Sequence, residues 1–466
     1  MRGIALSPHR AWTLLAVLMA ALTPSAAPAQ FFGHGQRGCP CPPSECTAPQ
    51  TTPCPAQEPA PPTPEVSRPA PAEAPPALPS LASGVSGGRG IAYSSPNMWG
   101  EFFGFQSLQF AVQLPPPQTT PPPTPPSNPP SGPPSPSPVA VLSKFATSGS
   151  TVVVSVPSPA GGGVVERTKV SEDNSPLPRD RVFFTYDFFG RVPFTGTDFD
   201  AHVFVLGFEK TFFDRLASIE VRIPFASTLD PDVVAGSSYS RDGEFGDLNI
   251  TLKGLLYSTP SLNVAAGLGI GIPTGPDSRV SLADGTALAR VKNESVILTP
   301  YVAYLVTPND RWFFQNWFEV GFDANGNPVE VNPTLTGLQG VGRLNDQTVL
   351  QIDAQLGYWM YRAGDNNRWI TALAPFIELH YNTSLDNADS IQSGAFSVTN
   401  SHNRFDELNL STGVVAQIGD NCTLALGAAF PLKNESNRSF DYQLGIRANI
   451  FFGPTARERS RATYVP

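Results

Sequence analysis

The sequence predicts an all-β protein, an antiparallel transmembrane β-barrel of about 12 strands preceded by a signal peptide and a disordered Pro-rich arm. Three observations lead to this prediction. From residue 181 onward, segments of about 9 to 13 residues alternate between apolar and polar side chains, as strands with two different faces do. The connections between these segments are alternately long and short. The polar positions are rich in Asn, Gln, Gly, Thr and Ser, whereas a soluble β-sandwich would place mainly Lys and Glu there.

The first residues have the composition of a secretory signal. Arg2 and Arg10 give a basic start, and the apolar run from Ala11 to Leu22 covers about 12 residues, too few to span a bilayer as a helix. An A-x-A site at Ala27–Ala29 predicts cleavage after residue 29, so residues 1–29 are expected to direct export to the outer membrane. An uncleaved N-terminal anchor is the alternative.

Residues 30–179 are expected to form a Pro-rich, mostly disordered periplasmic arm. The chain has 51 prolines, and about 30 of them lie between residues 40 and 138, far above the usual share of about 5%. An aromatic island at 91–114 interrupts this arm and could dock on the barrel, enter its lumen or bind a partner. Residues 151–156 could add one short strand.

The cysteines gather just after the signal peptide. In an oxidising compartment, this group favours two local disulfides, although metal binding is open. The four residues concerned are Cys39, Cys41, Cys46 and Cys54. Cys422 stands alone and is expected to be a small apolar residue on a strand. We expect neither a metal site nor a cofactor.

The barrel is predicted to occupy residues 180–453, with a polar tail at 454–466. Strands are expected to begin near Val182, His202, Leu216, Gly246, Leu262, Val296, Trp312, Val349, Ile370, Glu407, Cys422 and Phe440. The connections after odd-numbered strands have roughly 8 to 26 residues and those after even-numbered strands roughly 3 to 8, as in barrels with long external loops and short periplasmic turns. Both termini should therefore lie in the periplasm.

Two stretches of the sequence resemble known barrel proteins. The first comprises G-D-L-N-I at residues 246–250, G-L-G-I-G-I-P-T-G at 267–275 and L-T-P-Y-V at 298–302. It is similar to the phenol-degradation meta-pathway family of outer-membrane barrels, which is distantly similar to long-chain fatty-acid transporters. The second, residues 172–184, resembles the segment leading into the first strand of uncharacterised barrel proteins from planctomycete-type bacteria. The first resemblance implies uptake of apolar or aromatic small molecules.

If the apolar face of each strand meets lipid, a set of charged side chains points into the lumen, because charge on the lipid face costs about 2–4 kcal/mol at mid-depth. The candidates for this lining are Glu209, Glu220, Arg222, Asp247, Lys253, Glu319, Asp353, Asp441 and Arg447. They could select solutes, or they could pair with one another and stiffen the barrel.

These features predict a porin-like channel or transporter for small, apolar or aromatic solutes. The partners expected are membrane lipid and the solute, whereas the net charge of −9 argues against nucleic acid. One alternative is a structural anchor whose arm tethers a periplasmic partner or the cell wall. Another is a lipid-active enzyme using His380 with Asn382 and Ser384, but we expect no enzyme because such spacing alone does not assemble a nucleophile and its base.

Overall fold

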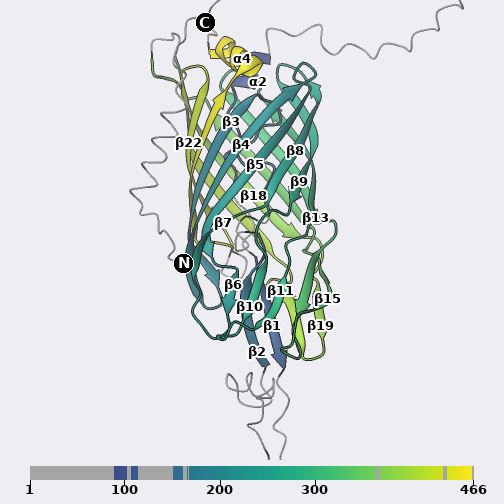
Figure 1. Cartoon of the computed structure of the whole chain (residues 1–466). Helices are drawn as coiled ribbons and strands as arrows, with labels where there is room; N and C mark the ends of the chain where they lie inside the picture. The colour runs from purple at the N-terminus through teal and green to yellow at the C-terminus, as the bar shows by residue number, and fades with distance from the viewer. Residues whose placement is uncertain are drawn as a thin grey trace, which may run out of the picture. The chain divides into compact units, whose positions relative to one another are not determined.

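Twelve strands close into one antiparallel barrel in the computed structural model of the chain (Figure 1). The structure describes residues 89–101, 106–113, 151–160, 165, 167–363, 368–433 and 438–463. The barrel closes because the last strand pairs with the first, from Tyr442 opposite Gly190 to Phe451 opposite Arg181. The fold class predicted from the alternation of polarity is therefore confirmed.

The observed strands follow the predicted segments closely. The barrel strands are β3 (Arg181–Phe194), β4 (Thr197–Phe212), β5 (Ala217–Leu229), β8 (Leu248–Ser258), β9 (Leu262–Ile272), β12 (Ile297–Val306), β13 (Trp312–Asp323), β16 (Val349–Tyr358), β18 (Ile370–Ser384), β21 (Asp406–Ile418), β22 (Cys422–Pro431) and β23 (Tyr442–Phe451). Two short strands, β7 (Arg241–Phe245) and β17 (Tyr361–Arg362), extend the same sheet. The largest difference is at β4, which begins before His202. Instead of a long loop, β3 and β4 meet in a tight turn at Thr195 and Gly196, both with positive φ.

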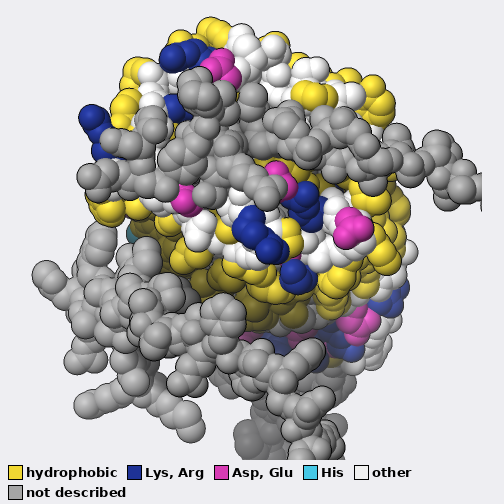
Figure 2. All heavy atoms as spheres, turned by 90° about the horizontal axis from the view of Figure 1, so that it is seen from above, with side chains coloured by type: hydrophobic (Ala, Val, Ile, Leu, Met, Phe, Trp, Pro, Cys, Tyr) yellow, Lys and Arg dark blue, Asp and Glu magenta, His cyan; other side chains and the backbone are white. Residues whose placement is uncertain are grey.

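Large apolar side chains cover the outside of the barrel. Residues of this outward set that are more than a third exposed include Leu206, Phe208, Ile219, Leu252, Val302, Phe318, Leu356, Ile377 and Leu444. Exposed aromatic side chains, including Phe213, Trp312 and Trp369, mark the end with the short turns. Figure 2 views the end that carries α2 and α4, where yellow hydrophobic side chains make up much of the perimeter and a group of charged side chains lies near the middle. A continuous apolar surface with an aromatic border is what a bilayer requires of a barrel.

The long connections fold into a cap at the opposite end. Its strands are β1 (Ser107–Gln113), β2 (Thr151–Pro157), β6 (Asp232–Val234), β10 (Ser278–Ser281), β11 (Ala287–Val291), β14 (Asn327–Val331), β15 (Gln339–Leu344), β19 (Ser390–Ser393) and β20 (Phe396–Asn400). They form two sheets, ordered β19-β20-β1-β2 and β15-β14-β11-β10-β6. A shared apolar core joins the sheets and includes Phe110 and Val156 from one and Val280 and Val329 from the other.

The barrel lumen contains two stretches of the segment that precedes the barrel. We call residues 92–101 the first pass, residues 165–180 the second pass, and both together the plug. Nearly all described plug residues are buried, and they bind inward-facing side chains of several wall strands. The described part of the expected periplasmic arm thus lies in the lumen and the cap. The sequence-based expectation differs because Pro-rich composition indicates poor self-packing, whereas here the barrel supplies the packing partners.

The two ends of the described chain meet at the short-turn end of the barrel (Figure 1). Helix α2 (Arg89–Ser94) leads into the first pass, and α4 (Gly453–Thr463) follows the last strand. The predicted polar tail is therefore largely helical. Its Arg459 is fully buried and donates to the backbone carbonyl of Tyr93 at 2.9 Å, which ties the two helices together. Within the described ranges, no helix combines the length and the apolar character needed to cross a membrane.

Candidate functional site

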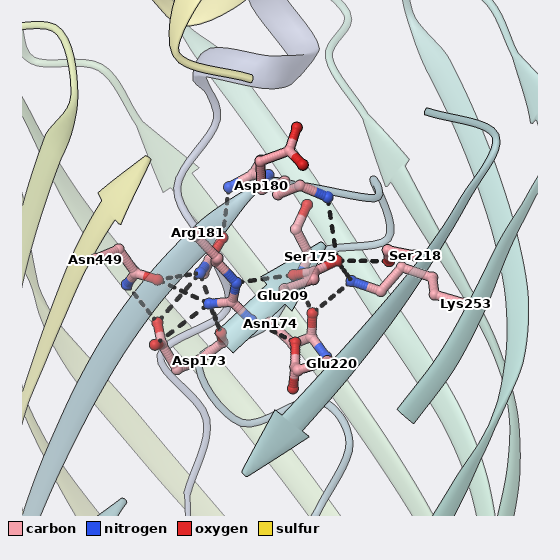
Figure 3. Close-up of polar contacts among 12 residues, drawn as sticks. Asp173, Asn174, Ser175, Asp180, Arg181, Glu209, Ser218, Glu220, Lys253 and Asn449 are labelled. Atoms are coloured by element: carbon pink, nitrogen blue, oxygen red, sulfur yellow. Dashed lines mark hydrogen bonds and ion pairs between the residues drawn. The ribbon is translucent and has the colours of Figure 1, made fainter. Parts of the chain in front are cut away.

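The buried guanidinium of Arg181 joins the second pass to three wall strands (Figure 3). Its Nε donates to Glu209 of β4 at 2.8 Å, and its Nη2 donates to Glu220 of β5 at 2.7 Å. Its Nη1 donates to the carbonyl of Asp173 in the plug at 2.5 Å and to Asn449 of β23 at 2.8 Å. Each partner is itself buried, so one side chain holds two carboxylates and the plug in fixed positions.

Glu209 is the most heavily bound carboxylate of this group (Figure 3). Besides Arg181, it accepts hydrogen bonds from Ser218 at 2.7 Å, from Lys253 at 3.0 Å and from the backbone N–H of Arg179 at 3.1 Å. Lys253 also donates to Asn174 of the plug at 2.7 Å. Wall and plug groups together therefore satisfy the charge and the hydrogen-bonding capacity of this carboxylate.

Other wall residues bind the backbone of the second pass. Glu319 accepts from the N–H groups of Val170 at 2.9 Å and Ser171 at 2.7 Å. Arg222 donates to the carbonyls of residues 169, 170 and 172, the shortest contact being 2.7 Å to Glu172. The wall thus supplies the hydrogen bonds that a regular sheet would otherwise give this irregular segment.

A pair of wall carboxylates holds both passes at once. Asp353 accepts from Lys169 and from Ser171 of the second pass, each at 2.6 Å. Glu378 accepts from the N–H groups of Trp99 and Gly100 of the first pass at 2.7 and 2.8 Å. Each pass of the plug is thereby held by a carboxylate on one of two adjacent strands, β16 and β18.

His380 lies between these two carboxylates. Its Nδ1 is 2.7 Å from Asp353, and its Nε2 is 3.2 Å from Glu378. The arrangement considered for a lipid-active enzyme is not formed, because Asn382 donates to Glu101 of the plug and Ser384 accepts from the backbone N–H of residue 405. The two ring nitrogens of His380 face the carboxylates of Asp353 and Glu378.

The ring of Trp99 occupies a niche made by glycines on β22 and β23. A Cβ atom on Gly427 would lie 2.7 Å from the ring, and one on the neighbouring Gly445 would lie 2.5 Å from it. The guanidinium of Arg447 lies 4.5 Å from the ring centroid, and its Nε donates to the Trp99 carbonyl at 3.1 Å. The aromatic island predicted at 91–114 thus supplies the main anchor of the first pass.

Most of the predicted lining residues lie together in this network. Those that bind plug atoms directly are Glu209, Arg222, Lys253, Glu319, Asp353 and Arg447. Glu220 is joined to the plug through Arg181 of β3, which donates to both Glu220 and Asp173. Asp441 lies just before β23 at the cap end and pairs with Arg191 at 2.9 Å and with Arg438 at 2.7 Å. Asp187 and Glu378 also belong to the network, although the alternation of polarity did not mark them as lining residues, and His380 was expected only as a possible enzyme residue. The cysteines at 39–54 lie outside the described residues.

Asp247 lies at the rim where β8 begins. Its Oδ1 accepts from the N–H groups of Thr274 and Gly275, each at 2.9 Å, and from Asn293 at 2.7 Å. Burial raises the pKa of this carboxyl from near 3.8 to about 6, although these hydrogen bonds act to lower it. The G-D-L segment at 246–248 and the P-T-G segment at 273–275 are therefore hydrogen-bonded to each other at the rim of the barrel.

These features define a transmembrane β-barrel whose lumen holds a plug from its own chain. Among the residues described, no group of three or more His, Cys, Asp or Glu side chains has the arrangement of a metal site. No protein-family profile and no curated protein matches the sequence. The likeness to the phenol-degradation meta-pathway family therefore stays a prediction.

Solved structures similar to this chain are outer-membrane barrels. The β domain of the Bordetella autotransporter BrkA has a TM-score of 0.39 and 13% identity, covering 59% of this chain and 100% of its own. An outer-membrane channel of Pseudomonas putida F1 has a TM-score of 0.40 and 12% identity, covering 59% and 97%. The Pseudomonas putida toluene transporter TodX has a TM-score of 0.33 and 9% identity, covering 63% and 96%. At these scores the likenesses carry no argument about what this chain does.

Proposed function

We propose that this protein is an outer-membrane channel for small solutes that its own plug holds closed. The observation that carries this proposal is that the wall binds the plug through polar contacts at mid-lumen. Seven of the nine predicted lining residues contribute to these contacts, either directly or through Arg181. Polar contacts of this kind can be exchanged for contacts with water, so they suit a segment that moves better than a fully apolar core does.

The first pass is the moving part in this proposal. Its described residues are held by Glu378, by Arg447, by the niche of Trp99 and by hydrogen bonds to the second pass, such as that from Met98 N–H to the carbonyl of Asn174 at 2.8 Å. The second pass is in addition continuous with β3 and held by the Arg181 network. Displacing the first pass would leave a narrow, charged passage beside the second. Apolar or aromatic solutes remain the finer proposal, and they rest on the resemblance at residues 246–275 alone.

Single-channel recording in a planar bilayer tests the proposal. The wild-type chain is expected to show small or no steady conductance, since the lumen is occupied. Arg447→Ser removes the hydrogen bond to the Trp99 carbonyl and the cation above its ring, so it should raise the conductance or alter its ion preference. Ile446→Ala is the matched control, because the neighbouring side chain alternates to the outward face.

The structural anchor is the rival function, and the same recording separates the two. An anchor needs no passage, so it predicts no conductance from wild type or from either variant. Equal effects at positions 446 and 447 would contradict the assignment of inward and outward faces on β23. A silent Arg447→Ser variant that still migrates as a folded barrel would favour the anchor, with its tethering of a periplasmic partner or the cell wall.

A further inference from the structure

The plug enters and leaves the lumen at the same end of the barrel. Helix α2 contacts α4 at the short-turn end, and the first pass runs from there into the lumen. The second pass returns to that end, where Asp180 binds Thr455 of α4 through its backbone N–H at 2.7 Å. The part of the chain between the two passes must therefore turn around at or beyond the opposite end.

The turning point is anchored in the cap by a regular ladder. Strand β1 pairs with β20 from Leu108 opposite Asn400 to Val112 opposite Phe396. Strand β20 belongs to the connection between β18 and β21, which is one of the long connections. Strand β1 is thereby fixed in the cap, at the end of the barrel that carries the long loops.

The direction of the β1–β2 pair shows which way its open end points. The pair begins on the lumen side, where the backbone N–H of Ser158 donates to the carbonyl of Gln106 at 3.2 Å. It continues outward through Ser107 opposite Pro157 and ends with Gln113 opposite Thr151. Gln113 and Thr151, where the described strands end, therefore lie on the side of the cap that faces away from the lumen.

We infer that the barrel carries residues 114–150 through its lumen and presents them on the same side of the membrane as its long loops. In the expected orientation this is the outside of the cell. The presented stretch is rich in Pro, Ser and Thr, and Lys144 is its single charged residue. This placement is opposite to that of the periplasmic arm expected from the sequence, and it adds surface presentation to the proposed channel function.

Inserted protease sites test the inference in intact cells. A recognition sequence for a specific protease is placed between Pro138 and Val139, and in a second variant after Gly132. A third variant carries it in the exposed turn at Asp284 and Gly285, between β10 and β11 of the cap. A fourth carries it between Asn309 and Asp310, in the short turn between β12 and β13. Heat-modifiable gel migration verifies that each variant forms a barrel.

Protease added to intact cells should cleave the two insertions in 114–150 and the cap turn, and should leave the 309–310 insertion intact until the outer membrane is opened. If the whole barrel has the reverse orientation, the cap turn will be protected and the insertions in 114–150 must be protected with it. The inference would be overturned if, in either orientation of the barrel, the insertions in 114–150 were cleaved or protected together with the 309–310 turn and not with the cap turn. This outcome is independent of conductance, so it is distinguishable from a failure of the channel proposal.

Discussion

The cap and the middle of the lumen hold the same hairpin by different forces. In the cap, β1 and β2 are held by backbone ladders and by an apolar core shared between two sheets. Inside the lumen the two passes meet in one antiparallel bridge, Met98 opposite Asn174, and are otherwise held mainly by buried ion pairs and charged hydrogen bonds. The difference indicates a hairpin whose contacts inside the lumen can be exchanged for contacts with water when a pass is displaced, whereas its outer end is stabilised only while its apolar side chains stay buried.

The largest loss of stability should come from removing Arg181, which joins several buried carboxylates of the network. Arg181→Met leaves Glu209, Glu220 and Asp173 buried without their shared cation, so we expect a loss of about 3–5 kcal/mol in the free energy of unfolding. Urea unfolding of the barrel in lipid vesicles measures this loss.

Arg191→Met is the matched control for that variant. Arg191 is 63% exposed and pairs with Asp441 near the cap end, so its replacement should cost no more than about 1 kcal/mol. Equal losses at positions 181 and 191 would contradict the view that buried charge holds the plug.

The next largest loss of stability is expected from a substitution in the apolar core of the cap. Phe110 on β1 is only 3% exposed, and Phe110→Ala should cost about 3 kcal/mol because it leaves a cavity between the two sheets. The loosened hairpin should become more susceptible to protease at the cap, with little change in conductance. Val153→Ala on β2 is the control, since that side chain is 53% exposed and makes no part of the core. A Phe110→Ala variant that conducts as freely as Arg447→Ser would remove the distinction between the two regions.

A smaller loss of stability is expected when the niche that holds the Trp99 ring is made narrower. Gly427→Ala places a Cβ 2.7 Å from the Trp99 ring, which should cost about 1–3 kcal/mol or displace the ring. We expect raised conductance with the Arg181 network intact. Gly254→Ala provides the comparison, because its added Cβ would meet nothing nearer than 3.7 Å. Unchanged conductance in Gly427→Ala, with native stability, would mean that the first pass does not gate the lumen.

The wall strands could be predicted from the sequence much better than the plug. The pattern that marks a strand is local, whereas the plug is defined by contacts between distant parts of the chain. A wall strand such as β23 reveals itself through local alternation of polarity, and its register follows from short turns. The plug has no period, and its contacts with the wall include many between residues far apart in the sequence, such as Trp99 and Glu378. One signal was available: residues 167–181 are rich in charge within an otherwise weakly charged arm, and the inward wall charges needed partners.

The same limit applies to the individual site residues. Alternation placed Glu209, Asp353 and Arg447 on the inner face, but it could not decide between solute selection and pairing. The lumen of a twelve-stranded barrel is wide enough for extra chain, so what fills it depends on segments outside the strands. For this reason Glu378 and His380, which hold the two passes together, were visible only once the plug was in place.

A pH-dependent effect on stability is expected at the boundary between the two regions, where Asp247 closes the rim. Burial raises its pKa from near 3.8 to about 6, so the folded chain keeps a proton there that the unfolded chain has lost. Stability should therefore fall as the pH rises from about 4 to about 6, and the loss should be complete at pH 7. Asp247→Asn keeps an oxygen that can accept from Thr274 and Gly275 but carries no charge. We expect this variant to be more stable than wild type at pH 7 and the advantage to vanish below about pH 4, as measured by urea unfolding at several pH values. An advantage that stays constant across this range would show that the buried charge of Asp247 has no part in the difference.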